Sequence, residues 1–279
     1  DAGAAGRRTS AKGAGLTWIA AYAAAGAFVG FLAGLLGIGG GMTLVPILSA
    51  LFAAQALAPA HTVHLALGTA MASIIFTSTA SVRAHHQRGA VDWRIVRRLA
   101  PAMATGALLA TLASGFVSQR ALALAFAAIV YAGATQMLFG GRPSASRGLP
   151  GTAPMLAVGT AIGVICGLVS AGGAFLTVPF MLFCRVPVLT AIGTAAAVGI
   201  PVALVGTAGF VASGWRVPDL PAASLGFVHL PALAALVAGS IATAPLGARL
   251  AHRLPATTLK RVFALLLFAL ATKMVLAYL

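Results

Sequence analysis

The amino-acid sequence predicts an all-α membrane protein that crosses the bilayer several times. Of the 279 residues, 60% are hydrophobic and only 8% are charged, and the mean hydropathy is +1.02. Soluble domains carry about a quarter of charged residues. Apolar runs of about 20 residues recur along the chain, each long enough to cross a hydrocarbon core as a helix. Since runs such as 121–138 and 263–279 are apolar on all sides, they favour helices over the alternating strands of a barrel.

Apolar segments fall into two groups of five, one in each half of the chain. They are predicted at about 17–37, 42–57, 64–84, 95–118 and 121–140, and then at about 152–170, 174–184, 187–212, 222–249 and 256–278. Residues 1–15 are rich in Ala, Gly and Arg and predict a flexible N-terminal tail. The stretch 142–151, rich in Gly, Pro, Ser and Arg, predicts a linker between a first repeat, 16–141, and a second, 152–279.

The two halves of the chain resemble each other in sequence. Residues 30–46 read GFLAGLLGIGGGMTLVP and residues 163–179 read GVICGLVSAGGAFLTVP, with several Gly residues and the final Val-Pro in one register. Farther along, ALGTA at 66–70 corresponds to AIGTA at 191–195. An internal duplication of this length predicts two structurally equivalent units.

The loop charges bear on how the two repeats are oriented. An odd number of segments in each repeat predicts inverted halves, in which the same loop faces opposite sides of the membrane. The basic loop is the one after the third segment in the first half and the one after the fourth segment in the second half. The loop after the third segment carries Arg83, Arg88, Arg94, Arg97 and Arg98 in the first half but only Arg216 in the second. The loop after the fourth segment carries Arg120 in the first half and Arg249, Arg253, Lys260 and Arg261 in the second.

Inversion would place the linker and the basic loops in the cytoplasm. It would also place Arg7, Arg8 and Lys12 outside. A parallel arrangement with a cytoplasmic N-terminus is therefore the alternative.

Acidic residues are scarce in this chain. Asp1, Asp92 and Asp219 stand against 18 Lys and Arg, there is no Glu, and the formal net charge is +15. The cations cluster between apolar runs, where they set topology and contact lipid headgroups, so no nucleic-acid partner is predicted. Carriers of cations and protons usually hold a carboxylate within the membrane. No acidic residue lies deep in a predicted segment, which favours an anion or a neutral substrate.

A glycine-rich stretch interrupts an apolar run in each half. Glycine permits backbone conformations that end a helix, so 37–41 and 170–174 predict helix breaks near the bilayer midplane. A helix that restarts there presents free N–H groups and the positive end of its dipole, which bind an anion without a charged side chain. The alternative is that these small residues only allow helices to pack closely.

The predicted anion site combines backbone and hydroxyl donors from both halves. Thr43 and Thr177 follow the breaks, while Thr69 and Thr194 lie in the third segments, where a hydroxyl faces the same cavity or bonds to its own helix. The predicted substrate-binding residues are Gly39, Gly40, Gly41, Thr43, Thr69, Gly172, Gly173, Ala174, Thr177 and Thr194.

The remaining reactive side chains form no catalytic or metal-binding pattern in the sequence. Cys166 and Cys184 lie in apolar segments and predict buried thiols. His61 and His64 have a spacing that suits a metal ion, but no third ligand is near them in sequence, which favours an interfacial pair. Neither G-x-S-x-G nor H-E-x-x-H occurs. The sequence therefore predicts no enzyme, no metal and no cofactor.

The paired motifs GLLGIGGGMTLVP and GLVSAGGAFLTVP, each followed by a GTA segment, resemble the TauE/SafE sulfite-exporter family of bacterial membrane permeases. The resemblance covers both repeats, although SAGGA at 170–174 departs from the fuller glycine run of the family. It implies a multi-pass permease of the bacterial inner membrane that exports a small sulfur-containing anion such as sulfite or sulfoacetate. Ion-coupled uptake of an organic or sulfur-containing anion is the alternative. The predicted partners are this anion and the lipid bilayer; the oligomeric state is left open.

Overall fold

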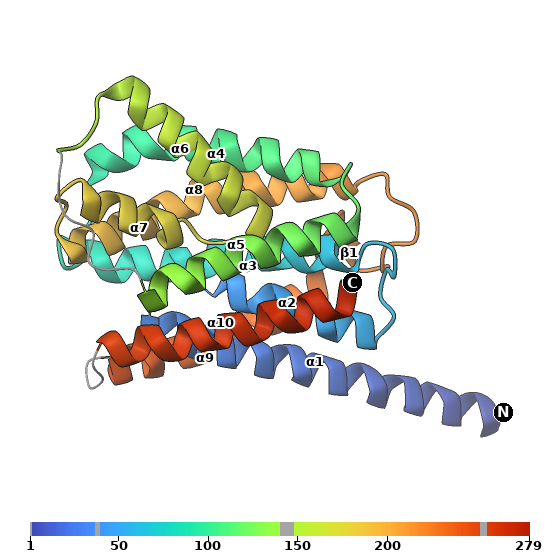
Figure 1. Ribbon diagram of the computed structural model, residues 1–279. Coiled ribbons are helices and arrows are strands. Elements are labelled where there is room, and N and C mark those ends of the chain that lie inside the picture. The colour runs from blue at the N-terminus through green and yellow to red at the C-terminus, as the bar shows by residue number, and fades with distance from the viewer. Residues whose placement is uncertain (1, 37–39, 140–147, 252–255) are drawn as a thin grey trace.

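Helices account for nearly all of the computed structural model, which describes residues 2–36, 40–139, 148–251 and 256–279 (Figure 1). In these ranges there are ten helices and one two-stranded hairpin. The elements are α1 (Ala2–Leu36), α2 (Gly41–Ala54), α3 (Thr62–His86), α4 (Trp93–Ser114), α5 (Gln119–Phe139), α6 (Thr152–Val169), α7 (Ala174–Phe183), α8 (Val188–Gly214), β1 (Ser224–Leu225), β2 (Val228–His229), α9 (Leu230–Ala251) and α10 (Ala256–Tyr278).

Eight of the described helices are long and apolar enough to cross a membrane. The other two, α2 and α7, have only 14 and 10 residues. At 1.5 Å per residue they extend about 21 Å and about 15 Å, well short of a hydrocarbon core of roughly 30 Å. The predicted all-α, polytopic fold class is thereby confirmed, and the two short helices are those that follow the glycine-rich stretches.

One predicted segment is wrong at its start. The range 222–249 is apolar enough to suggest a single helix, but α9 begins only at Leu230 and a hairpin precedes it. Ser224 pairs with His229 and Leu225 with Val228, around a turn that begins at Gly226, whose φ is +53°. Proline in the preceding loop and a glycine that accepts a positive φ both oppose a continuous helix here.

The other differences lie at the repeat boundaries. The structure places residues 2–15 in α1, where the composition predicts a flexible tail, and alanine, which is frequent there, is the strongest helix former. Residues 140–147, which include most of the predicted linker, lie outside the described residues.

The two halves of the chain are interlocked. α1 packs along α9 and α4 packs along α6, so that in each pair one helix comes from each half (Figure 1). The first glycine of each repeated motif makes the approach close. A Cβ on Gly30 would lie 2.4 Å from the Cα of Ser240, and a Cβ on Gly163 would lie 2.1 Å from the carbonyl oxygen of Met103. For these two glycines, close helix packing is therefore the observed role.

The third helices of the two halves, α3 and α8, pack against each other at the centre of the molecule. The Cβ positions of Gly206 and Gly199 lie 3.0 Å and 3.1 Å from side-chain atoms of Met71 and Ser78. Because residue numbers rise along one helix as they fall along the other, α3 and α8 run antiparallel.

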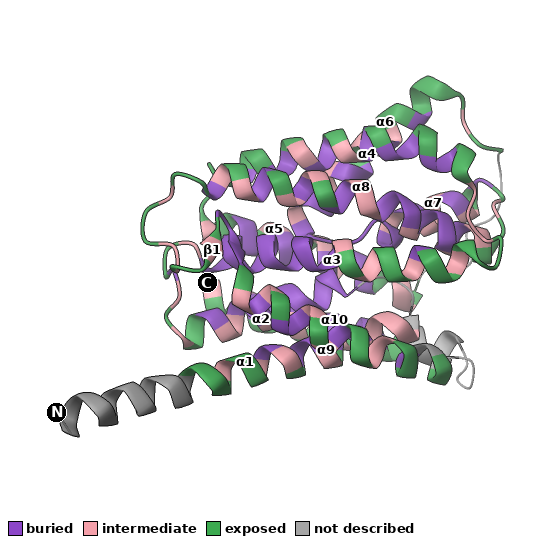
Figure 2. Ribbon diagram, turned by 180° about the vertical axis from the view of Figure 1, so that it is seen from behind, coloured by how far each residue is buried: buried purple, intermediate pink, exposed green. Residues whose placement is uncertain are grey.

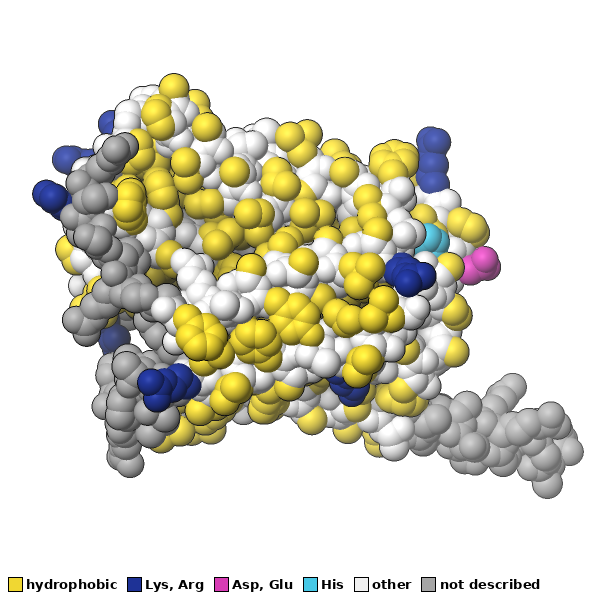
Figure 3. Space-filling model, in the orientation of Figure 1, with side chains coloured by type: hydrophobic (Ala, Val, Ile, Leu, Met, Phe, Trp, Pro, Cys, Tyr) yellow, Lys and Arg dark blue, Asp and Glu magenta, His cyan; other side chains and the backbone are white. Residues whose placement is uncertain are grey.

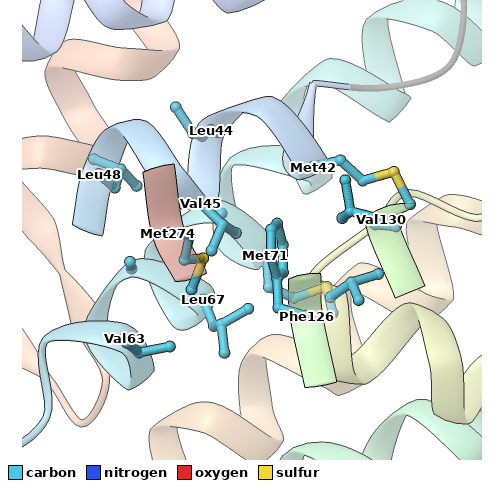
Figure 4. Close-up of a cluster of buried hydrophobic side chains, with 14 of the residues drawn as sticks. Met42, Leu44, Val45, Leu48, Val63, Leu67, Met71, Phe126, Val130 and Met274 are labelled. Atoms are coloured by element: carbon cyan, nitrogen blue, oxygen red, sulfur yellow. The ribbon is translucent and has the colours of Figure 1, made fainter. Parts of the chain in front are cut away.

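Buried apolar side chains form the core beneath the short helix α2. Figure 4 shows side chains of α2, α3, α5 and α10 converging there, and Val45, Leu48, Leu67, Met71 and Phe126 are fully buried. Burial is concentrated in α2, α3 and the facing part of α8, whereas the outer helices expose one side (Figure 2). These exposed sides carry large apolar residues that suit contact with lipid.

The helix ends fall into two groups that lie at opposite ends of the bundle. At the left end in Figure 1 lie the end of α3, the start of α4, the connection from α7 to α8 and the ends of α9 and α10 that adjoin 252–255. More Lys and Arg side chains lie toward this end than toward the other, with an apolar surface between the two ends (Figure 3). The described arginines on these segments are Arg83, Arg88, Arg94, Arg97, Arg98, Arg185, Arg249 and Arg261. The hairpin and both described chain ends lie at the other end, far from this basic end (Figure 1).

Candidate functional site

The second glycine-rich stretch is a helix break. α6 ends at Val169, Ser170 adopts a left-handed conformation with φ 46° and ψ 43°, and α7 begins at Ala174. The Ala171 N–H donates to the Cys166 carbonyl at 3.0 Å, a bond that closes the end of α6. Ser170 stands in a conformation that favours glycine, and its hydroxyl donates to the Leu67 carbonyl of α3 at 2.8 Å. This bond anchors the break to α3.

The first glycine-rich stretch also separates two helices. α1 ends at Leu36 and α2 begins at Gly41, with Gly40 as its N-cap. Residues 37–39, including the predicted site residue Gly39, lie outside the described residues. Gly40 lies against α1: a Cβ on Gly40 would be 2.0 Å from Cγ1 of Val29.

The structure brings the two breaks into contact. A Cβ on Gly41 would lie 2.0 Å from the Ser170 carbonyl oxygen and 3.1 Å from Cδ1 of Ile74. From the other break, the Cβ position of Gly172 lies 3.4 Å from Cγ2 of the same isoleucine. Both breaks therefore meet on α3, at Ile74, which is fully buried.

On the other side of this junction lies the equivalent point of α8. Gly199 stands in the second repeat where Ile74 stands in the first, in the register that aligns 66–70 with 191–195. Its Cβ position is 3.7 Å from the backbone nitrogen of Gly173. The breaks thus lie at the region where the two central helices cross.

The starts of α2 and α7 carry unneutralised positive dipole ends. The first turn of a helix leaves N–H groups without an intrahelical acceptor, and no side chain caps Gly40 or Gly173. Of the described acidic residues, Asp92 caps α4 and Asp219 lies in the loop after α8, so neither is at the breaks. The junction is buried and combines two uncapped helix starts with the carbonyl end of α6.

A small cavity borders the first break. Its volume is about 20 Å³, and it is lined by α1, α2, α3 and α9 together with Gly40; the polar lining side chains are Ser73, Thr77 and Ser240. A water molecule needs about 10–15 Å³ by the same measure, so there is room for about one. In this conformation the junction is closed to a larger ion.

The predicted hydroxyl donors near the breaks are buried and already engaged. Thr43 donates to the Gly40 carbonyl at 2.8 Å, within the first turn of α2. Thr177 lies 3.5 Å from the sulfur of Met103, a weak acceptor, so its proton is the more available of the two. Both side chains are fully buried.

Thr69 and Thr194 lie apart from the breaks, in matching positions at opposite ends of the central helices. The Thr69 hydroxyl accepts the His229 N–H at 3.0 Å, and the Thr194 hydroxyl accepts the Asp92 N–H at 2.9 Å. His229 and Asp92 each stand directly before the fourth helix of a half, α9 or α4. Each threonine therefore accepts a hydrogen bond from the residue that directly precedes a helix of the other half.

The glycine before each threonine shows the same reciprocity. A Cβ on Gly68 would lie 2.1 Å from the Phe227 carbonyl oxygen, and a Cβ on Gly193 would lie 2.1 Å from the Ala90 carbonyl oxygen. We call Gly68-Thr69 with 227–229 the hairpin latch, and Gly193-Thr194 with 90–92 the basic-end latch. The repeated GTA segment signals these latches in the sequence, but nothing in the sequence shows which loop each one holds.

Sequence reasoning also missed two features of the break region. Ser170 replaces a glycine of the pattern and bonds to α3, and Ser73, Thr77 and Ser240 line the cavity from other helices. Isolated hydroxyls inside apolar segments were the available signal for the cavity.

Comparison with known proteins identifies the family. The family model described as sulfite exporter TauE/SafE matches residues 22–274, nearly the whole chain. The chain belongs to the TauE/SafE family.

Similar proteins extend over nearly the same length. A probable membrane transporter protein of Haemophilus influenzae is 35% identical over 254 residues, 89% of this chain and 95% of that protein. Proteins with the same description from Xylella fastidiosa and Bacillus subtilis are 29% and 23% identical and are covered to 90% each. No solved structure gives a significant match. Membership of the TauE/SafE family agrees with the eight helices that are long enough to span a membrane.

Proposed function

We propose that this membrane protein of the TauE/SafE family is a transporter that exports a small sulfur-containing anion, such as sulfite or sulfoacetate, across the bacterial inner membrane. The observation that carries the proposal is the buried contact between the two breaks, each of which leads into an uncapped helix and at which the described part of the chain places no carboxylate. Helix starts of this kind attract an oxyanion, and no carboxylate of the described residues is present there to hold a cation. The family and the similar transporter proteins support a transport role.

In this proposal the anion binds between the starts of α2 and α7. Backbone N–H groups at Gly40 and Gly41 would face those at Gly172, Gly173 and Ala174, and the hydroxyls of Thr43 and Thr177 would add donors. Helix dipoles and N–H groups together bind oxyanions without a charged side chain. Since the cavity beside the break holds about one water, the helix starts must separate before an anion of several heavy atoms can bind.

We further propose that the halves are inverted repeats that work by alternating access. The antiparallel course of α3 and α8 and the reciprocal pairs α1 with α9 and α4 with α6 support a pseudo-two-fold relation. In this mechanism the two latches are the gates, so Thr69 and Thr194 act on access to the anion. Opening the hairpin latch would expose the junction on one side, and opening the basic-end latch would expose it on the other.

The basic end is assigned to the cytoplasm in this proposal. Cytoplasmic loops of membrane proteins carry an excess of Lys and Arg, and the described arginines are concentrated at one end of the bundle. The hairpin latch would then face the outside.

Flux measured with purified protein in liposomes tests the proposed substrate. We expect vesicles loaded with sulfite to lose it only when the protein is present, with sulfoacetate competing and potassium or ammonium having no effect beyond ionic strength. Transport of a cation in the same vesicles, or no competition between anions, would overturn the proposal. Liposomes that contain the protein with Gly41→Ala provide a matched control for leakage.

A further inference from the structure

A pair of histidines lies beside the hairpin latch, at the end of the molecule opposite the basic end. His64, in the first turn of α3, is 2% exposed, and its ring lies 5.4 Å from that of His61 and 4.9 Å from that of Phe227, centre to centre. His61 is half-buried and also packs on Phe227, at 5.6 Å. The turn of the hairpin therefore covers both imidazoles.

Hydrogen bonds fix the tautomer of His64. Its Nε2 lies 3.0 Å from the Ser114 carbonyl oxygen and 3.1 Å from the Val117 carbonyl oxygen. Carbonyl oxygens only accept hydrogen bonds, so Nε2 carries the proton and Nδ1 carries the lone pair. In the described part of the chain, this Nδ1 is buried without a hydrogen-bond partner, and so is the Nδ1 of His61.

Two buried nitrogens without partners indicate a ligand, and the surroundings decide which one. A metal ion would need further ligands, and the described residues contain no group of three His, Cys, Asp or Glu that could hold one. His229 cannot complete such a site with its Nδ1, which accepts the Ala232 N–H at 3.3 Å. A proton needs only one lone pair.

We propose that Nδ1 of His64, reached through His61, is a proton-binding site that releases the hairpin Ser224–His229. Binding adds one proton to a neutral imidazole and breaks no bond, since Nε2–H keeps its two carbonyl acceptors. The proton would enter through His61, which is half-buried and whose ring contacts that of His64. Proton binding and hairpin release do not require transport, whereas the use of the hairpin as a gate rests on the proposed function.

The coupling follows from the cost of a buried charge. An imidazolium under the hairpin is poorly solvated, and it lies close to His61, which is cationic when it is protonated. Contact with the face of Phe227 offsets only part of this cost. Movement of the hairpin admits water, so the released state binds the proton more tightly, and proton binding must favour release.

The bonds that the proton would weaken are few. The hairpin is held by the His229 N–H on Thr69, by the Phe227 N–H on the Phe210 carbonyl at 3.2 Å and by the Leu230 N–H on the Ala223 carbonyl at 3.0 Å. All three lie within a short segment that ends at α9, and in this proposal movement of the segment removes Phe227 from the face of His64.

The charged and titratable groups on the surrounding elements leave His64 as the responsive one. Besides His61, they are Arg120 at the start of α5, His229 in β2, and Arg216 and Asp219 in the loop before the hairpin. Burial lowers the pKa of the His229 imidazole, and its Nδ1 already accepts the Ala232 N–H, whereas the Nδ1 of His64 has no hydrogen-bond partner among the described residues.

Thiol labelling measures hairpin release directly. In a chain with Cys166→Ala and Cys184→Ala, Val228→Cys places a reporter in β2, where the native side chain is 2% exposed. Phe116→Cys, at a site 94% exposed at the same end of the molecule, corrects for the pH dependence of the maleimide reaction. We expect the corrected labelling rate to rise from about pH 8 to about pH 5.5, by up to about tenfold per pH unit for one linked proton.

His64→Gln distinguishes the proposed site from other causes. The glutamine amide can still donate to the Ser114 and Val117 carbonyls, but it does not titrate, so the rise should disappear. His86→Gln, an exposed histidine at the basic end, should leave the rise unchanged.

A corrected rate that does not change with pH, or a rise that persists with His64→Gln, would overturn the proposed proton site. Hydrogen exchange of the His229 amide, corrected for its intrinsic pH dependence, gives the same answer if Val228→Cys does not fold. Because neither measurement involves an anion, failure of the proton site and failure of the transport proposal give separate results.

Discussion

Single residues determine whether the two breaks can form an anion site. Thr43→Val and Thr177→Val keep the side-chain shape and remove one hydroxyl each. A hydrogen bond to a charged group contributes about 1.5–3 kcal/mol, so we expect the affinity for sulfite to fall by roughly 10- to 150-fold in each variant. Inhibition of flux by increasing sulfite measures this affinity.

Thr79→Val is the matched control for these variants. Its hydroxyl donates to the Ile75 carbonyl of its own helix at 2.6 Å on an exposed face, and we expect the affinity to stay unchanged. Equal affinity in all three variants would remove the threonines from the site and leave the backbone as its only donor.

The contact between the breaks is tested by a single methyl group. With Gly41→Ala the added Cβ would lie 2.0 Å from the Ser170 carbonyl oxygen, and backbone atoms must move to relieve the overlap. Overpacking of this kind costs about 1–3 kcal/mol, and the displaced backbone N–H groups would no longer converge on one anion. We expect a lower thermal midpoint in detergent and the loss of sulfite flux. Gly15→Ala, where nothing lies within 4 Å of the Cβ position, should change neither.

The residue types at the breaks were predictable, but their partners were not. Glycines in an apolar run indicate that a helix must stop, and the structure shows α6 ending at Val169 as 170–174 predicts. The bond from Ser170 to Leu67 joins positions 103 residues apart, and local sequence carries no information on it. The anion itself stays a prediction at Gly40, Gly41, Gly172, Gly173 and Ala174.

Helices and loops form the next scale, where the two latches act. Thr69→Val should weaken the hairpin latch, and Thr194→Val should weaken the basic-end latch, because each removes the acceptor of one backbone N–H. The net loss of one hydrogen bond is about 1 kcal/mol, or about a fivefold increase in opening. Cysteines at Val228 and at the buried Ala191, in a chain without native cysteines, report the two ends separately.

We expect Thr69→Val to raise labelling at Val228→Cys and Thr194→Val to raise labelling at Ala191→Cys. If either substitution raises both rates equally, it destabilises the whole bundle, and the latches do not act as separate gates. Thr79→Val again provides a control in which an exposed threonine loses its hydroxyl.

Element boundaries followed from hydropathy except where local chemistry opposed it. The range 222–249 is apolar throughout, and hydropathy alone extends the helix over it; Pro221 and Gly226 show why the chain forms a hairpin before α9. Hydropathy averages over a window, so it cannot detect a short hairpin inside an apolar run. The hairpin is the part of the structure that covers the histidines, and it was absent from the sequence-based fold.

At the scale of the whole molecule, the sequence predicted the duplication but not the packing of each half against the other. Matching 30–46 with 163–179 predicts two similar units, and it agrees equally with units that lie side by side. In the structure each half completes the other, because Thr69 and Thr194 bond across the repeats and α1 and α4 pack on helices of the opposite half. Neither half buries its own apolar surface alone, so we expect the chain to unfold as one cooperative unit.

Direction of transport is a property of the whole molecule in its membrane. An anion that leaves a negatively charged interior gains about 2.3 kcal/mol per charge per 100 mV, so export needs no coupling ion. The described spans contain no Asp or Glu, and Asp92 only caps the start of α4, so no carboxylate relay is available to drive uptake with protons or sodium.

We therefore expect the membrane potential alone to move sulfite toward the positive side in liposomes without a proton or sodium gradient. A potential of opposite sign should reverse the flux, and liposomes with the Gly41→Ala protein should show neither movement. Flux that appears only when a proton or sodium gradient is imposed would contradict uncoupled export and assign the protein to ion-coupled uptake.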